Sequence, residues 1–198
     1  MILAVDTSLG TAVAVVDAAG TVVAEASSAD PLGHAEVIGD LLAQVARPGI
    51  THVVAGMGPG PFTGLRIGIA AARAFALGRG IPVVPVPSHY AAALTRRDAG
   101  GARFAIVTDA RRREVAVSVF DGTDADGIPE LVAPTRLLPQ NALDAAALDA
   151  PPTWTTTIDA AALARVGARA LAAGRTLAGD EPLYLRHPDV SIPRQVGR

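Results

Sequence analysis

The chain has 198 residues, of which 50% are hydrophobic and 18% are charged, and its formal net charge is −2. That length and apolar content suit one large domain or two small lobes with a real core. All 17 basic residues are arginine, and the net charge of −2 excludes strong electrostatic binding of nucleic acid by this chain alone. Cysteine is absent, which excludes disulfides and thiolate chemistry.

The N-terminus begins directly on an apolar segment, without the basic region and cleavage site of a secretion signal. No uncharged apolar run of about 18 residues occurs, because Arg66 and Arg73 interrupt the best candidate. We therefore expect a cytoplasmic protein that does not cross a membrane.

The first half of the chain alternates short apolar runs with amphipathic segments. Apolar, β-branched runs between turn residues predict strands, and apolar residues spaced at i, i+3 and i+4 predict helices. The predicted strands are residues 1–5, 11–17, 21–28, 51–55 and 81–86, and the predicted helices are residues 34–45, a long run that ends at 79, and 88–96 with Ser88 as its cap. The order β-β-β-α-β-α-β-α predicts a mixed sheet with helices packed on it.

A turn rich in glycine and proline, residues 56–62, precedes the long helix. Glycine permits positive φ and proline fixes φ at about −65°, so we expect a sharp and rigid turn. Thr63 is the predicted N-cap of the helix. The helix is apolar almost all round, which predicts burial on more than one side. Gly64 and Gly68 share one face, where another backbone segment can approach closely.

The second half opens on two predicted strands, with the basic turn Arg111-Arg112-Arg113 between them. Three adjacent charges favour a solvated hairpin tip over a phosphate contact. The predicted strands are residues 103–109, 114–120 and 131–133, and the predicted helices are a weak one at 143–148 and a strong one at 159–173, with Asp159 as N-cap. Beyond them, residues 182–186 are expected to return extended toward the core, and residues 187–198 to be mobile.

The segment Asp98-Ala99-Gly100-Gly101 is the predicted boundary between two lobes, because it is rich in turn-forming residues. We expect an N-terminal lobe at residues 1–99 and a smaller C-terminal lobe at residues 100–198. Each lobe opens with a hairpin, which is compatible with two lobes of one ancestral type.

The turn at residues 56–62 does not fit the common nucleotide-binding motifs. A dinucleotide fingerprint needs a third glycine where Pro61 stands, and a Walker phosphate loop needs a lysine, which the chain lacks. Backbone amides of the turn could still hold an anion, although Pro59 and Pro61 remove two donors. A structural turn that packs the helix is the favoured interpretation.

Asp6, Thr7 and Ser8 follow the first strand, within a hairpin. In an actin-like nucleotide lobe, this position contacts phosphate or a metal-bound water. Aspartate and threonine also form hydrogen bonds within turns. The sequence leaves both interpretations open.

Neither a metal site nor a nucleophile is indicated by the sequence. His34 and Glu36 begin a helix, where glutamate complements the helix dipole, but no third ligand stands at a matching spacing. His89 is followed four residues later by Ala93, so it forms no His-x-x-x-His pair. There is no Gly-x-Ser-x-Gly motif and no cysteine. We expect no catalytic residue, no metal and no cofactor.

Several motifs stand in order along the chain, and together they resemble the TsaB (YeaZ-like) family, from the glycoprotease-like branch of the actin-like ATPases. They are Asp6-Thr7-Ser8, His34-Ala35-Glu36, Gly-Pro-Gly-Pro-Phe-Thr-Gly-Leu-Arg-Ile-Gly at residues 58–68, Asp109-Ala110-Arg111 with Glu114-Val115, and Tyr184-Leu185-Arg186. The resemblance covers most of the chain, and residues 58–68 are its most specific part. Pro61 and Ala35 depart from the family pattern, in which serine is common at both positions.

The resemblance implies an α/β fold of two actin-like (ribonuclease H-like) lobes, each a mixed sheet that begins with antiparallel strands and is flanked by helices. It implies a non-catalytic subunit, without a protease site, that supports the catalytic paralogue TsaD in forming N6-threonylcarbamoyladenosine in tRNAs that read ANN codons. The implied partners are TsaD, a TsaE-type ATPase and tRNA through the complex, and a second copy when the chain is alone.

In this family a helix pair, here at residues 34–45 and in the run after Phe62, contacts the equivalent pair of the partner. The resemblance thereby places the interface at His34, Val37, Ile38, Leu41, Val45, Leu65, Arg66, Ile69 and Arg73. The rival hypothesis is an actin-like ATP-binding kinase or ATPase that uses Asp6 and Thr7 on phosphate, with Ser8 beside them. A weaker rival is an RNA-binding subunit that uses Arg111, Arg112 and Arg113.

Overall fold

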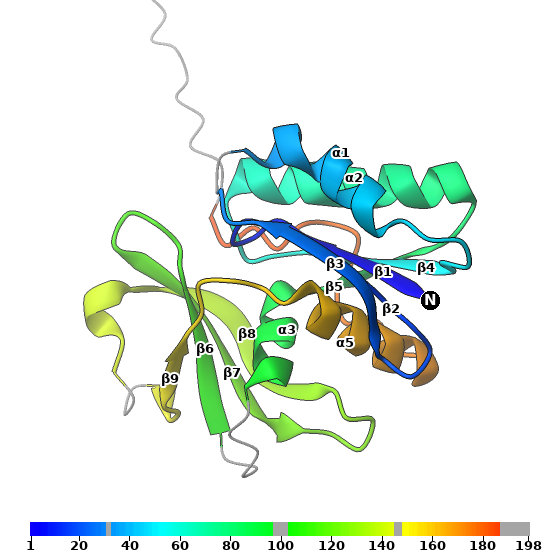
Figure 1. Ribbon diagram of the computed structural model, residues 1–198. Helices are drawn as coiled ribbons and strands as arrows, with labels where there is room; N and C mark the ends of the chain where they lie inside the picture. The colour runs from blue at the N-terminus through cyan, green and yellow to red at the C-terminus, as the bar shows by residue number, and fades with distance from the viewer. Residues whose placement is uncertain (31–32, 97–102, 145–147, 187–198) are drawn as a thin grey trace, which may run out of the picture.

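The computed structural model describes residues 1–30, 33–96, 103–144 and 148–186. Two β-sheets form separate layers, with two helices between them and two more on the outer face of the first sheet (Figure 1). This is the α/β arrangement of two mixed sheets flanked by helices that the family resemblance implies. Within the described ranges, no helix has the length and apolar character needed to span a membrane.

The first sheet has the strand order β3-β2-β1-β4-β5. β1 (Ile2–Asp6), β2 (Thr11–Val16) and β3 (Val22–Ser28) are antiparallel neighbours, whereas β4 (His52–Gly56) and β5 (Val83–Val86) run parallel to β1. Gly10 and Gly20 have φ values of 91° and 79°, which lets both hairpins turn tightly. The predicted order of strands and helices in this half is confirmed.

Helices cover both faces of this sheet. α1 (His34–Val45) and α2 (Phe62–Arg79) lie side by side on one face, and α5 (Ala160–Ala172) packs on the other (Figure 1). α3 (Ser88–Thr95) packs against α5 and the second sheet. Gly167 lets α5 lie close to β4, because a Cβ at this position would be 2.4 Å from Cγ2 of Val54. The sheet is therefore buried on both faces.

α2 is buried on one side only, contrary to the prediction. Of its buried positions, Leu65, Ile69, Ala72 and Ala76 belong to the core beneath the helix, and Gly64 and Gly68 face the turn after β1. The opposite face is exposed, and Leu77 there is 85% accessible. Alanine and glycine supply much of the apolar composition of the exposed face, and such small residues lie readily at a surface.

The predicted caps of α2 and α3 are wrong. Pro61 and Pro87 are the N-cap residues, and neither helix has a side-chain cap. Thr63 lies inside the first turn of α2, because the fixed φ of Pro61 lets the helix begin earlier. The hydroxyl of Ser88 donates instead to the carboxylate of Asp6.

The second sheet has the strand order β8-β7-β6-β9. β6 (Arg103–Asp109), β7 (Glu114–Thr123) and β8 (Pro129–Pro139) are antiparallel, and the unpredicted β9 (Pro152–Trp154) runs parallel to β6 at the edge. β8 is much longer than the predicted strand, which ends before Pro134. The β7–β8 register shifts at this proline, where the ladder accommodates a residue without an N–H.

α5 is capped as predicted, because Oδ1 of Asp159 accepts from the amides of Ala161 and Ala162 at 2.8 and 3.0 Å. A short 3₁₀ turn (Gln140–Ala142) lies between β8 and β9. Part of the helix predicted at 143–148 and the whole tail at 187–198 lie outside the described residues.

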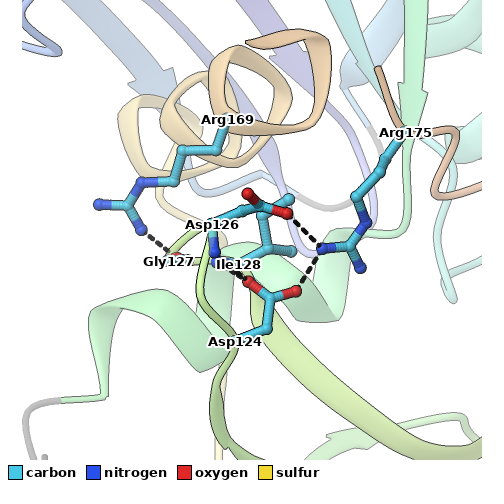
Figure 2. A network of polar contacts seen from close by, with 6 residues as sticks. All are labelled: Asp124, Asp126, Gly127, Ile128, Arg169 and Arg175. Carbon is cyan, nitrogen blue, oxygen red and sulfur yellow. Dashed lines mark hydrogen bonds and ion pairs between the residues drawn. The ribbon is translucent and has the colours of Figure 1, made fainter. Parts of the chain in front are cut away.

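Arg169 in the last turn of α5 and Arg175 just beyond the helix hold the turn between β7 and β8 (Figure 2). Arg175 pairs with Asp124 and, at 3.2 Å, with Asp126. Arg169 donates to the carbonyl of Gly127. Because α5 also packs on the first sheet, this network fixes the second sheet relative to the first.

One core is shared by both halves of the chain. It lies between the two sheets and joins residues of the first sheet, such as Val54, to Phe120 of the second and Leu163 of α5. The predicted boundary at residues 98–101 lies outside the described residues. The division into lobes at 1–99 and 100–198 therefore stays a prediction.

Candidate functional site

The turn after β1 surrounds the buried carboxylate of Asp6. Its Oδ1 accepts hydrogen bonds from the amide and hydroxyl of Ser8, at 2.8 and 2.5 Å, and its Oδ2 accepts one from the hydroxyl of Ser88 at 2.5 Å. Burial raises the pKa of Asp6, and the hydrogen bonds from Ser8 and Ser88 oppose that shift. A glycine is needed at position 56, because a Cβ on Gly56 would lie 1.9 Å from Oδ2 of Asp6.

Thr7 fixes this turn to α2. Its hydroxyl donates to the carbonyl of Gly64 at 2.7 Å, and a Cβ on Gly68 would lie 2.1 Å from the same oxygen. Gly60 also lies close to this turn, since a Cβ there would be 2.8 Å from the Cα of Ser8. The close approach predicted at Gly64 and Gly68 is confirmed, and the neighbouring segment is the turn after β1.

Asp6, Thr7 and Ser8 are 1%, 1% and 2% exposed, and each side chain is hydrogen-bonded within the chain. In this arrangement none of the three presents an oxygen to a phosphate or to a metal-bound water. Of the two interpretations that the sequence leaves open, the geometry favours the hydrogen-bonded turn.

The two histidines considered as metal ligands are buried against hydroxyl groups. Nδ1 of His34 lies 2.8 Å from Oγ1 of Thr11, and His89 lies 2.7 Å from Oγ of Ser118 and 3.0 Å from Oγ1 of Thr108. Burial lowers the pKa of His89 to about 3, so its imidazole is neutral at physiological pH. Where the structure describes the chain, no three histidine or acidic side chains are grouped as a metal site requires.

The residues expected at a partner interface fall into two groups. Most belong to the chain's own core beneath α1 and α2, with exposures of 8% or less: His34, Ile38, Leu41, Val45, Leu65 and Ile69. Val37 is half-buried, and Arg66 and Arg73 are exposed. The buried members support the fold of the helix pair, the exposed ones are open to solvent, and the place of the whole set at a partner interface stays a prediction.

The solvent-facing surface of α1 and α2, which we call the α1/α2 outer face, consists mainly of small and charged residues. Its α1 residues are Ala35, Glu36, Gly39, Asp40, Ala43 and Gln44, and its α2 residues are Thr63, Arg66, Ala70, Arg73, Ala74 and Leu77. α1 carries the exposed acidic residues Glu36 and Asp40, and α2 carries the exposed Arg66 and Arg73, which donate to the hydroxyl of Tyr184 and to the carbonyl of Asp180.

A pocket of about 540 Å³, which we call the interlobe pocket, lies between the two halves. Residues 59–62 of the glycine–proline turn, residues 108–112 of the β6–β7 hairpin and residues 183–186 line most of it. The hairpin tip that the sequence assigns to solvent is exposed, and Arg111 and Arg112 within it line this pocket.

The segment at residues 175–186, which we call the C-terminal strap, closes one side of the interlobe pocket. The amide of Leu183 donates to the carbonyl of Met57 at 2.8 Å. Arg186 forms an ion pair with Glu114 beside the hairpin tip. The strap thus contacts both halves of the chain, and its predicted return toward the core is confirmed.

Sequence reasoning does not find the interlobe pocket, because its walls come from three distant segments. The motifs at residues 58–68, 109–111 and 184–186 are each visible as separate patterns. Their meeting depends on the shared core and on the path of the strap, which no local pattern reports.

Solved structures share this architecture. A protein described as similar to the peptidase YeaZ from Pseudomonas aeruginosa is 27% identical, with a TM-score of 0.74 over 93% of this chain and 99% of that one. YeaZ from P. aeruginosa itself is 24% identical, with a TM-score of 0.70 and the same coverage, which indicates the shared fold. The two sheets, their strand order and the flanking helices define an α/β protein of the actin-like, YeaZ type.

The family follows from the sequence match. Residues 34–170, well over half of the chain, match the family TsaD, tRNA N6-adenosine threonylcarbamoyltransferase, and the chain belongs to this family as a TsaB-like member. An uncharacterized protein of Mycobacterium leprae is 42% identical over 109 residues, which are 52% of this chain and 28% of that protein. One from Mycobacterium tuberculosis is 43% identical over 103 residues, 48% of this chain and 46% of that protein. The matched region thus spans less than half the length of these relatives.

Proposed function

We propose that this chain is a non-catalytic subunit that binds and supports a TsaD-type catalytic paralogue in forming N6-threonylcarbamoyladenosine in tRNAs that read ANN codons. The observation that supports the non-catalytic role is the environment of His89. The catalytic paralogue is expected to hold its metal with a His-x-x-x-His pair at this place. In this chain the ring of His89 is hydrogen-bonded to the hydroxyl groups of Ser118 and Thr108. Ala93 occupies the position of the second histidine of such a metal-binding pair.

The α1/α2 outer face is the proposed contact with the paralogue. Acidic residues lie on α1 and basic residues on α2, so a two-fold arrangement of two such faces would bring opposite charges together. Small side chains at Gly39, Ala43, Ala70 and Ala74 would let the helices pack closely, and Leu77 would lose its exposed apolar surface. The same complementarity supports a homodimer when the chain is alone.

The remaining partners follow from this role. A TsaE-type ATPase and tRNA would join through the complex, since the net charge of −2 does not favour binding of RNA by this chain alone. A role on tRNA implies the cytoplasm. The alternative, an actin-like kinase or ATPase, has less support, because Asp6 and Thr7 are buried and hydrogen-bonded within the chain.

The test is reconstitution of the modification from purified proteins. The reaction holds unmodified tRNA, threonylcarbamoyl-adenylate, the TsaD-type paralogue and the TsaE-type ATPase of the same organism, with or without this chain. We expect modified adenosine, measured by chromatography of digested tRNA, only when this chain and the paralogue are both present. Full activity without this chain, or ATP turnover by this chain alone, would contradict the proposal.

A further inference from the structure

The interlobe pocket has a basic edge. Arg111, Arg112 and Arg186 line it, and among the described residues that line it the only carboxylate is that of Asp109. This carboxylate accepts a hydrogen bond from the amide of Arg111 at 3.0 Å, and Arg186 is paired with Glu114. Arg111 and Arg112 are both exposed, so a ligand from solvent can reach their side chains.

The backbone of this edge is strained. Arg111, Arg112 and Arg113 have φ values of 62°, 56° and 60°, all in the left-handed region. For a residue with a side chain, this conformation costs roughly 1–2 kcal/mol. Glycine or asparagine would relieve the strain. Strain of this kind is concentrated at functional sites, and here it holds two guanidinium groups at the rim of a pocket.

Aromatic rings also line the interlobe pocket. The rings of Phe62 and Tyr184 lie with their centroids 4.8 Å apart, and both residues belong to its lining. The guanidinium carbon of Arg66 lies 3.9 Å from the centroid of Phe62, and its Nε donates to the hydroxyl of Tyr184 at 2.9 Å. Many proteins bind single-stranded nucleic acid by combining arginines, which neutralise the phosphates, with aromatic rings, on which the bases stack.

The chemistry of the pocket suits a phosphodiester better than a nucleoside triphosphate. A triphosphate brings Mg²⁺, which is held through carboxylates and phosphate oxygens. Asp6 and Thr7 are buried, and the described part of the chain has no group of three histidine or acidic side chains for a cation. A phosphodiester has a single charge and needs no cation, so two arginines suffice to neutralise it.

We propose that the interlobe pocket holds one nucleotide of single-stranded RNA, with its phosphate at Arg111 and Arg112 and its base at the rings of Phe62 and Tyr184. This inference rests on the proposed function and assigns to this chain a direct contact with the RNA substrate. Because the chain has a net charge of −2, the contact adds to the affinity of a complex and is weak for the chain alone.

The test is fluorescence anisotropy with a short fluorescein-labelled single-stranded RNA, titrated at several salt concentrations. The full-length chain is measured alone at low salt and mixed with the TsaD-type paralogue, and light scattering of the same samples reports the complex. The variants are Arg111→Asn and Arg112→Asn, because asparagine accepts the left-handed conformation and keeps the turn folded. Arg79→Gln, at the far end of α2, removes the same charge as a control.

We expect each asparagine variant to lose several-fold in affinity and to lower the slope of log affinity against log salt by about 0.7. Arg79→Gln should change neither, and excess ATP should not displace the RNA. Unchanged affinity in both asparagine variants, displacement of the RNA by ATP, or no RNA binding in either sample would overturn the inference. A missing complex would count against the proposed function instead, and the variants measured in the chain alone would still decide the site.

Discussion

The hydroxyl of Thr7 donates to the carbonyl of Gly64 across 57 positions of the sequence, at a distance of 2.7 Å. The bond joins the turn after β1 to the first turn of α2. α2 can lie this close because Gly64 and Gly68 have no side chains on the face that meets Thr7. The position of the α1/α2 outer face therefore depends on glycines that lie on the opposite, buried side of α2.

Replacing Gly68 by alanine tests this packing. The added Cβ would lie 2.1 Å from Oγ1 of Thr7, so we expect Gly68→Ala to lower the free energy of unfolding by about 1–3 kcal/mol. Gly78, in the same helix, has nothing within 4 Å of such a Cβ, and Gly78→Ala should raise that free energy by roughly 0.5–1 kcal/mol. Urea unfolding measures both. Equal effects of the two substitutions would contradict the packing described here.

The pH dependence of stability should reveal the buried carboxylate of Asp6. Burial raises its pKa above the ordinary value of 3.8, so the folded state binds this proton more tightly than the unfolded state. The contribution of protonated Asp6 to the free energy of unfolding is fully present below pH 3.8. It is lost as the pH rises from 3.8 through the pKa that Asp6 has in the folded protein. Asp6→Asn removes the ionisation, and its stability relative to the wild type should increase as the pH rises over that window.

The measurement for Asp6 is urea unfolding at a series of pH values, with Asp40→Asn on the exposed side of α1 as the matched control. A constant difference in unfolding free energy between Asp6→Asn and the wild type across this series would show that the carboxylate does not titrate as its burial requires.

His89 should make the protein less stable as the pH falls, which is the opposite of the effect of Asp6. Burial lowers its pKa from 6.5 to about 3, so the unfolded state binds the proton more tightly, and stability is lost as the pH falls below 6.5. At pH 5 the loss should be roughly 2 kcal/mol relative to pH 7, at 1.36 kcal/mol for each pH unit below 6.5. Urea unfolding of His89→Gln should show a smaller difference between these two pH values. Imidazole resonances of His89 that titrate near pH 6.5 would refute the account.

The sequence is sufficient to place elements where one physical signal dominates. The apolar spacing in residues 34–45 sets the bounds of α1, and the turn residues around the first strands set their hairpins. Local sequence patterns do not predict the structure correctly where contacts between distant parts of the chain determine it. β8 continues past Pro134 because a shift in register accommodates it, and Ser88 bonds to Asp6 because the two meet only in the folded chain.

The candidate site, too, could be predicted from the sequence only in part. The family resemblance predicts an interaction surface on α1 and α2, but a helix rich in alanine and glycine does not show which side packs on the sheet. Leu65 and Ile69 are in the core, and the neighbouring Arg66 and Ala70 are exposed. The interlobe pocket requires contacts between three distant segments, which only the structure displays.

Two neighbouring residues of α2 should respond differently to the same substitution. Ile69 is 4% exposed, so Ile69→Arg would place a charge in the core and unfold the protein. Ala70 is exposed on the α1/α2 outer face, and Ala70→Arg should keep the circular dichroism spectrum and thermal stability of the wild type. A folded Ile69→Arg variant would show that the two faces of the helix are assigned incorrectly.

The central claim is that this chain forms a complex with a catalytic paralogue through the α1/α2 outer face. Size-exclusion chromatography with light scattering, on this chain mixed with the TsaD-type paralogue of the same organism, tests it most directly. We expect a stoichiometric complex for the wild type and for Ala172→Arg, which alters an exposed position of α5, and separate proteins for Ala70→Arg. The absence of a wild-type complex, or a complex that Ala70→Arg leaves intact, would contradict the claim.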